Sequence, residues 1–128
     1  MQNAHGDIIR DFAHLPGVGF ATCSNDYMVK AWTMEGEALA TLSGHTSFVF
    51  GLASNPITNE LASGSEDKTV RIWRGFECVQ IINFPGTVWC VAYNHLGDLI
   101  TGCEDYLMRT FTRDLLRIAP EEEMKVFN

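Results

Sequence analysis

The sequence has few basic residues. Its 128 residues include 9 Lys and Arg against 16 Asp and Glu, so the formal net charge is -7 at pH 7. Phosphate backbones and anionic membrane surfaces attract basic patches, so we expect neither a nucleic acid nor a membrane surface as the main partner. No apolar run approaches the roughly 18 residues of a membrane span, and no charged and apolar leader opens the chain. We expect an intracellular protein of the cytoplasm, with the nucleus as a second compartment.

The common signatures of chemistry are missing as well. The four cysteines form no C-x-x-C pair, which predicts free thiols in a reducing compartment. No glycine-rich phosphate loop precedes a predicted helix, and no group of His, Cys and acidic residues has the spacing of metal ligands. We therefore expect no metal, no cofactor and no enzymatic activity.

A repeated segment stands out in the rest of the chain. The nine residues SNDYMVKAW at 24–32 are followed by SEDKTVRIW at 65–73 and CEDYLMRTF at 103–111. Asp26, Asp67 and Asp105 hold the same position in the three copies, at a spacing close to the roughly 40 to 45 residues of a propeller blade. The predicted fold class is therefore all-β, a β-propeller built from four-stranded antiparallel blades.

The repeats divide the chain into blade one at residues 1–42, blade two at 43–83 and blade three at 84–114. In blade two, alternating apolar residues and intervening turns predict strands at 48–52, 61–65, 69–73 and 77–84. Blade three is predicted to lack its own outer strand, because no alternating segment follows residue 111. The remaining residues, 115–128, form a C-terminal tail in which Pro120 and Glu121–Glu123 suit the first turn of a short helix.

Three blades make only a partial ring. A propeller typically closes with 4 to 8 blades, and an open arc leaves two apolar faces uncovered. We infer that the chain carries the last three blades of a longer propeller, with a separate three-blade protein as the alternative. The isolated arc should also associate with itself through its open faces and edge strands, for example by dimeric six-blade closure.

The segment from Gly44 to Trp73 resembles the WD-repeat family of β-propellers. This resemblance implies a hydrogen-bonded tetrad in which a histidine, a serine or threonine, an aspartate and a tryptophan connect the strands of a blade. The members would be His45, Ser63, Asp67 and Trp73 in blade two, and His5, Thr22, Asp26 and Trp32 in blade one. Blade three keeps Thr101 and Asp105 but has Phe84 and Phe111 at the outer positions, so its network should be shorter.

A serine, a histidine and an aspartate also form the catalytic triad of many hydrolases. In this chain, however, the set of Ser63, His45 and Asp67 recurs with the period of the blades, which a single active site would not require. A tryptophan N–H donor extends the same set. A structural role is therefore the better interpretation.

A closer resemblance covers nearly the whole chain. The segments GHTSFVFGLA at 44–53, SEDKTVRIWRGFECVQ at 65–80, TVWCVAYNHLGDLITG at 87–102 and EEEMKVF at 121–127 are similar to the phospholipase-activating protein family. This resemblance implies a non-catalytic adaptor whose propeller binds ubiquitin in protein degradation or sorting. Later domains of that family, absent here, add a second ubiquitin site and a dock for a hexameric AAA segregase. The alternatives are a generic scaffold for protein complexes and an activator of a phospholipase.

Blade geometry predicts which residues would face a partner. The positions three and five residues after the tetrad histidine, and the position before the turn aspartate, should lie on one rim of the ring. These positions are Ile8, Arg10 and Asn25 in blade one, Phe48, Phe50 and Glu66 in blade two, and Thr87, Trp89 and Glu104 in blade three. We expect an apolar patch with an acidic border, because buried aromatic anchors dominate interface energies. The alternative is that some of these side chains turn inward and pack between blades.

Overall fold

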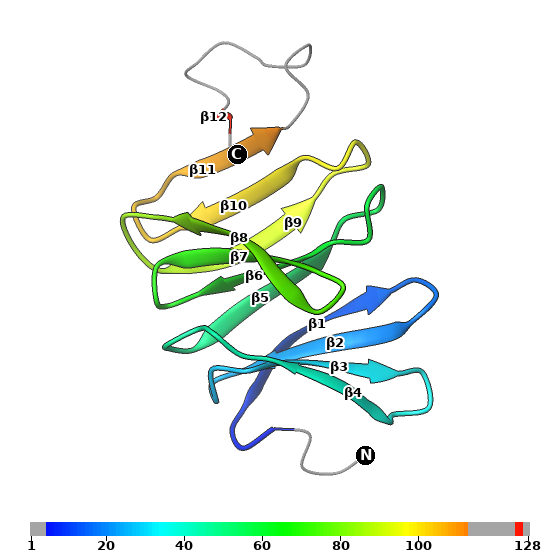
Figure 1. Cartoon of the computed structure of the whole chain (residues 1–128). Coiled ribbons are helices and arrows are strands. Elements are labelled where there is room, and N and C mark those ends of the chain that lie inside the picture. Colours follow the sequence, from blue (N-terminus) through cyan, green and yellow to red (C-terminus); the bar gives the residue numbers. More distant parts are fainter. Residues whose placement is uncertain (1–4, 113–124, 127–128) are drawn as a thin grey trace.

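The computed structural model describes residues 5–112 and 125–126. Figure 1 shows three sheets stacked in chain order. Blade one consists of β1 (Ile9–Leu15), β2 (Gly19–Ser24), β3 (Val29–Thr33) and β4 (Ala38–Leu42). Blade two consists of β5 (Val49–Ser54), β6 (Leu61–Ser65), β7 (Thr69–Arg74) and β8 (Glu77–Asn83). Blade three contains β9 (Val88–Tyr93), β10 (Leu99–Cys103), β11 (Met108–Thr112) and β12 (Lys125–Val126).

Strand order within each blade follows the chain. Neighbours from β1 to β4, from β5 to β8 and from β9 to β11 pair antiparallel, as hairpin-connected strands do. The predicted all-β propeller architecture with three blades in a partial ring is confirmed. No helix in the described part of the chain is long and apolar enough to cross a membrane.

The outer edge of blade three differs from that of the other two. The two residues of β12 pair parallel with β11, with Phe111 opposite Lys125. Within residues 5–112, no antiparallel strand pairs with β11 on that side, so a two-residue contact from the tail stands in for a regular outer strand. The helix predicted around Pro120 lies outside the described residues.

The core lies between the blades because each sheet presents an apolar face to its neighbour. The innermost strands β1, β5 and β9 lie side by side across the two blade boundaries. One core cluster joins Ala13, Ala21, Cys23, Val29 and Ala31 of blade one with Val49, Leu52, Leu61 and Trp73 of blade two. A second joins Ala62, Val70 and Ile72 of blade two with Val88, Val91, Leu99 and Phe111 of blade three. Burying one such aliphatic side chain fully contributes roughly 1.5–3 kcal/mol.

Each innermost strand contains a β-bulge near its start. Pairing with the neighbouring strand skips one residue in each innermost strand. The consecutive paired residues are Ile9 and Asp11 in β1, Val49 and Gly51 in β5, and Val88 and Cys90 in β9. A bulge re-aims the side chain of its extra residue, and the three extra residues are Arg10, Phe50 and Trp89.

Candidate functional site

The aromatic residues at the start of the innermost strands form one continuous surface. Tyr27 and Phe48 have ring centroids 6.2 Å apart, and Phe48 meets Phe50 edge-on at 6.1 Å. The rings of Phe50 and Trp89 then stack at 4.9 Å with an interplanar angle of 20°. We call Tyr27, Phe48, Phe50 and Trp89 the aromatic rim. It crosses both blade boundaries, so its shape depends on how the three blades pack.

Arg10 lies at the blade-one end of the aromatic rim. Its guanidinium carbon is 5.3 Å from the ring centroid of Phe50, which is a cation–π distance. Its Nε donates to the Asn25 side-chain oxygen at 2.7 Å. This hydrogen bond orients the guanidinium over the ring. The rim therefore has a positive charge over Phe50.

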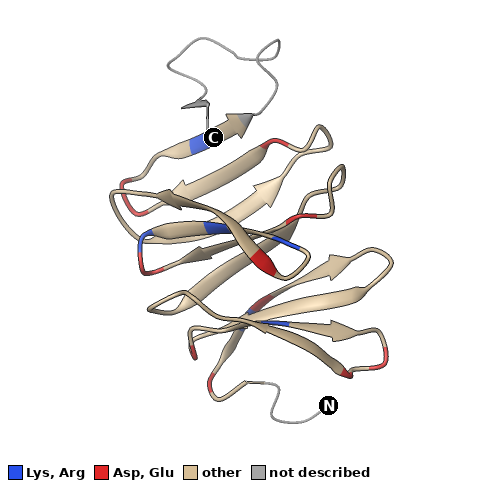
Figure 2. Cartoon of the chain, viewed as in Figure 1, with Lys and Arg blue, Asp and Glu red and all other residues tan. Residues whose placement is uncertain are grey.

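Two acidic residues border the rim. The backbone N–H of Glu66 donates to the carbonyl oxygen of Phe48, and that of Glu104 donates to the carbonyl oxygen of Thr87, both at 2.9 Å. These bonds hold each acidic residue beside the start of its innermost strand. Both residues are exposed, and Figure 2 shows acidic segments in the turns of the blades. A partner would meet an apolar strip with carboxylates along its border.

Two of the predicted rim residues are not available at the surface. Asn25 is only 8% exposed and Thr87 only 7%. The Asn25 side-chain oxygen accepts from Arg10 Nε instead, and the Thr87 N–H donates to the Glu104 carboxylate at 3.0 Å. Asn25 therefore positions Arg10, and Thr87 positions Glu104, but neither is exposed enough to contact a partner. Ile8 is exposed, as expected.

Tyr27 is a rim residue that sequence reasoning missed. It follows the turn aspartate Asp26 and adopts a left-handed conformation with φ of 74°. Lys68 and Tyr106 occupy the equivalent turn positions and are also left-handed, with φ of 71° and 67°. The signal in the sequence was a tyrosine directly after the aspartate in two of three copies. The direction of the Tyr27 side chain could not be predicted, because it depends on the left-handed turn and non-glycine residues rarely adopt positive φ.

The tetrad residues of blade two form a continuous hydrogen-bonded chain. The His45 Nδ1 lies 2.8 Å from the Asp67 carboxylate and its Nε2 lies 2.6 Å from the Ser63 hydroxyl. The Trp73 indole N–H donates to the same hydroxyl at 2.9 Å. Blade one repeats this arrangement. His5 meets Asp26 at 2.8 Å and Thr22 at 2.6 Å, and Trp32 donates to Thr22 at 3.0 Å.

The directions of these bonds indicate a neutral histidine. The Ser63 oxygen accepts from the indole N–H, so its own proton is available to His45 Nε2, and His45 Nδ1–H can donate to Asp67. Burial lowers the pKa of His45 below its usual 6.5, although the Asp67 carboxylate opposes that effect. This keeps the imidazole neutral at neutral pH.

The aspartates of both tetrads stay ionised. Burial alone would raise the pKa of Asp67, but hydrogen bonds from Thr69, Thr46 and His45 outweigh it and lower the pKa below 3.8. For Asp26, burial is likewise outweighed by the N–H groups of Met28 and Gly6 and by His5. A carboxylate that accepts several hydrogen bonds is stabilised in its charged form.

The described residues of blade three form no such chain. Phe84 and Phe111 meet edge-on with ring centroids 5.8 Å apart, where the other blades have histidine and tryptophan. The hydroxyl of Thr101 is buried and has no hydrogen-bond partner among the described residues. Asp105 is bound instead by the Arg109 guanidinium at 2.5 Å, and this contact lowers the pKa of Asp105. The network of blade three is therefore an ion pair beside an aromatic pair.

The set of Ser63, His45 and Asp67 has the wrong surroundings for a hydrolase. Ser63 is fully buried and His45 is 5% exposed. The Trp73 indole occupies the hydroxyl from the other side. A nucleophile needs a free approach for its substrate, which these contacts close. The tetrads connect strands and stabilise blades.

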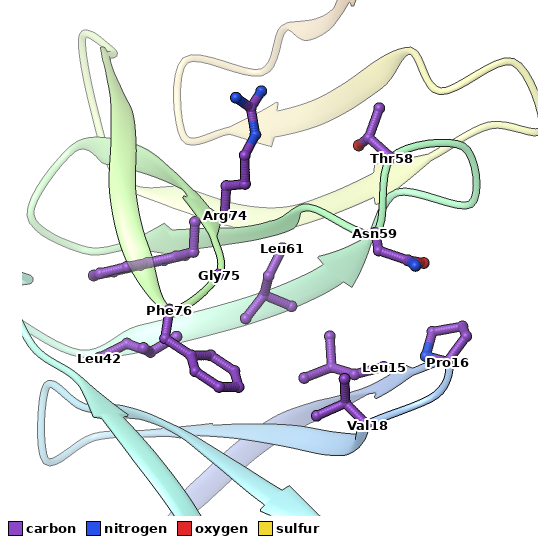
Figure 3. Close-up of a pocket in the computed structure, with 11 residues that line it drawn as sticks. Leu15, Pro16, Val18, Leu42, Thr58, Asn59, Leu61, Arg74, Gly75 and Phe76 are labelled. Carbon is purple, nitrogen blue, oxygen red and sulfur yellow. The ribbon is translucent and has the colours of Figure 1, made fainter.

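A pocket of about 280 Å³ with a mainly apolar lining lies between blades one and two. It is beside the turns at the edge of the sheets opposite the aromatic rim. Figure 3 shows Leu15, Val18, Leu61 and Phe76 turned toward this space, while the Arg74 guanidinium points away from it. That guanidinium binds the buried Glu60 carboxylate, with Nε to Oε2 at 3.0 Å. The pocket therefore has few polar groups to orient a ligand.

Comparison with known proteins identifies the family. The family described as "WD domain, G-beta repeat" matches residues 36–74 and 76–111. The chain belongs to the WD40 repeat family. Its blades have the arrangement of that family, and the tetrads described above lie within them.

The similar proteins include relatives of the phospholipase-activating protein family, which confirms the closer resemblance. The "Ubiquitin homeostasis protein lub1" of Schizosaccharomyces pombe is 48% identical over 125 residues, which is 97% of this chain and 17% of that protein. The crystal structure of the WD40 β-propeller domain of Doa1 superimposes with a TM-score of 0.83 at 36% identity, over 91% of this chain and 40% of that one. The "Nuclear distribution protein PAC1" of Candida dubliniensis is 34% identical over 66% of this chain and 19% of that protein.

Proposed function

We propose that this chain is a ubiquitin-binding WD-repeat adaptor module, without catalytic activity, that acts in ubiquitin-dependent protein degradation or sorting. The observation that carries the proposal is the aromatic rim, with its stacked Phe50 and Trp89 and its two acidic neighbours. The similarity to the ubiquitin homeostasis protein lub1 supports ubiquitin as the partner. The chain spans 17% of that protein, so the proposal concerns the propeller segment alone.

The chemistry of the rim suits ubiquitin. Ubiquitin's binding face is apolar with a basic edge, and the rim is apolar with exposed Glu66 and Glu104 beside it. Trp89, 52% exposed, can lose water from its outer face on binding. Aromatic anchors of this kind provide most of the energy of an interface. Complementary charges at the border speed association and favour one orientation.

The test is isothermal titration of ubiquitin into the chain and three variants. Phe48→Ala and Trp89→Ala remove rim side chains, and each should weaken binding by about tenfold or more, as truncated hot-spot residues do. Ile57→Ala is the matched control, because Ile57 is equally apolar and 67% exposed but lies in the turn between β5 and β6 at the far edge. Circular dichroism establishes that all four proteins are folded. Unchanged affinity in both rim variants would contradict the proposal.

Two assays with the same protein distinguish ubiquitin binding from two other functions. A scaffold that assembles complexes without ubiquitin would bind no ubiquitin at micromolar concentration in a pull-down. An activator of a phospholipase, as the family name suggests, would change the rate of that enzyme on addition. We rank both below ubiquitin binding, because the rim offers an apolar surface with acidic neighbours.

We further propose the cytoplasm, with the nucleus as a second compartment, as the place of action. Contact with an AAA segregase would require domains outside this chain. Self-association through the open blade faces belongs to the proposal as well.

A further inference from the structure

The pocket between blades one and two lies at a boundary whose two blades are both part of the described chain. Leu15, Pro16 and Val18 of blade one line one side, and Phe76 of blade two lines the other together with the turn before β6. Figure 3 shows the side chains of Val18 and Phe76 turned toward the same space. None of the aromatic rim residues lines it. The pocket is therefore a separate feature of the surface.

At the second boundary, between blades two and three, the equivalent turns are joined by a hydrogen bond. The Asn55 side-chain N–H donates to the carbonyl oxygen of Gly97 at 3.3 Å. The two turns pack so closely that a Cβ on Gly97 would lie 3.0 Å from the Asn55 side-chain oxygen. A polar side chain therefore closes the second boundary at the edge opposite the rim.

The first boundary has an apolar residue in place of this polar one. Leu15 and Asn55 hold the same position in the repeat, since each directly precedes a proline at the end of its innermost strand. Asn59 corresponds to Gly97, because both are left-handed, with φ of 61° and 81°, and the N–H of each bonds back to the start of its turn. Leucine cannot donate the bond that Asn55 makes. Leu15 and Asn59 instead both line the pocket.

Phe76 forms one wall of the pocket from a constrained turn. Arg74 and Glu77 pair across a two-residue hairpin, so Gly75 and Phe76 make up the turn. Both are left-handed, with φ of 57° and 71°, a conformation that asparagine and glycine supply in most hairpins of this kind. The ring of Phe76 is 41% exposed and faces the pocket. The backbone of the hairpin thus holds an aromatic ring at the edge of the pocket.

Acidic residues lie on both sides of the pocket. Glu77 directly follows the aromatic residue of one wall. On the other side, Glu35 and Glu37 lie in the turn between β3 and β4, which the pairing of β2 with β3 places beside the turn that carries the blade-one lining. All three glutamates are exposed. The basic residue of the lining, Arg74, binds the buried Glu60 and points away from the space. Charge complementarity therefore favours a basic partner here.

We propose that this pocket is a second binding site, which takes one aromatic side chain from a peptide segment of a partner protein, with lysine or arginine next to that side chain. A cavity of roughly 150 Å³ holds a benzene molecule, so a pocket of about 280 Å³ accommodates one ring. The ring would lie against Phe76 and the Trp73 indole, which both line the pocket. An aromatic side chain buried in a pocket is the usual anchor of an interface. The site does not rest on the proposed function, because it lies at the edge opposite the rim.

The test titrates the chain with a short synthetic peptide that has one phenylalanine between two lysines in a glycine and serine context. The indole N–H resonances of the tryptophans report where it binds. The Trp73 ring lines the pocket, whereas Trp89 is exposed on the rim. The Trp73 resonance should shift in a saturable manner while that of Trp89 stays in place. Replacing the two lysines of the peptide by glutamates should weaken binding by about tenfold.

Phe76→Gly tests the wall of the pocket and keeps its turn, because glycine adopts a positive φ readily. It should weaken binding of the lysine peptide by about tenfold. Leu96→Ala is the matched control. Leu96 is 49% exposed in the turn between β9 and β10, at the same edge of the sheets, and does not line the pocket. Circular dichroism establishes that both variants are folded, and both should keep the parent's affinity for ubiquitin.

Several outcomes would overturn the inference. The lysine peptide could leave the Trp73 resonance unmoved, or the glutamate peptide could bind equally well, which would show apolar adsorption without a choice of charge. A mass above 14.3 kDa that falls to this value in Phe76→Gly would show a second copy of the chain in the pocket. Displacement of the peptide by ubiquitin would show that the pocket has no partner of its own. If ubiquitin instead fails to bind and the peptide shifts Trp73, the proposed function fails and the second site stands.

Discussion

Phe50 and Trp89 stack with ring centroids 4.9 Å apart, although they belong to different blades and lie far apart in sequence. Both are the extra residue of a β-bulge, and Arg10 is the third. The bulges release these side chains from the regular alternation of the strands and aim them at one rim. The rim thus owes two of its aromatic side chains to a backbone irregularity that recurs in each blade.

The same substitution at equivalent positions of two blades should have opposite effects on stability. Thr22→Val removes the hydroxyl that joins His5 and Trp32 and leaves buried polar groups without partners, which costs about 1–3 kcal/mol for each group. Thr101→Val removes a buried hydroxyl that has no partner in the described part of the chain, so the free energy of unfolding should stay level or rise by about 1 kcal/mol. Urea denaturation of the two variants measures both effects. Equal losses would contradict the assigned networks.

Removing the histidine of blade two should loosen that blade. His45→Ala leaves the Ser63 hydroxyl and the Asp67 carboxylate without their shared partner, and the expected loss is about 2–4 kcal/mol in the free energy of unfolding. His14→Ala is the control, because His14 is exposed on β1 and lies outside the tetrads. Denaturation midpoints equal to the parent's in both variants would contradict the tetrad assignment.

Stability should fall as the pH drops below 6.5. The pKa of His45 is lowered in the folded state by burial, so the unfolded chain binds more protons in this window. The stability that the neutral His45 contributes is therefore fully present above pH 6.5. It is lost as the pH falls toward the pKa of His45 in the folded state. The lowered pKa values of Asp26 and Asp67 act in the same direction but only below about pH 3.8. Urea midpoints at pH 7.5 and pH 5.5 test this, with His45→Ala as the variant whose dependence should be smaller.

The four thiols should react in two classes. Burial raises the pKa of the Cys23 thiol to about 12, so at pH 8 only about one molecule in ten thousand carries the reactive thiolate there. Cys103 is also buried, whereas Cys78 and Cys90 are exposed. Titration with a chromogenic disulfide at pH 8 should give two rapid thiols in the folded chain and four after denaturation. Four rapid thiols without denaturant would show that the blade interiors are open.

The blade architecture could be predicted because its signals repeat. Asp26, Asp67 and Asp105 mark the same turn in each copy, and the alternating segments between them give the strands. The two-residue pairing of β12 with β11 could not be predicted, because so short a segment carries no alternation.

The rim was predicted only in part. Its positions follow from the spacing to the tetrad histidine, but whether a side chain faces solvent depends on contacts that spacing does not describe. Asn25 and Thr87 are buried, and the Asn25 side chain and the Thr87 N–H bond Arg10 and Glu104. Tyr27 reaches Phe48 because its turn is left-handed. These features come from the bulges and turns, which the alternation of apolar residues does not record.

The central claim is that ubiquitin binds at the aromatic rim, and the indole N–H resonances of the three tryptophans test it most directly. Trp32 and Trp73 are 7% and 4% exposed within their tetrads, whereas Trp89 is 52% exposed on the rim. Trp89→Phe assigns the rim signal. On titration with unlabelled ubiquitin, the account predicts that the Trp89 resonance shifts in a saturable manner while those of Trp32 and Trp73 stay in place. A Trp89 resonance that remains unmoved at saturating ubiquitin would contradict it.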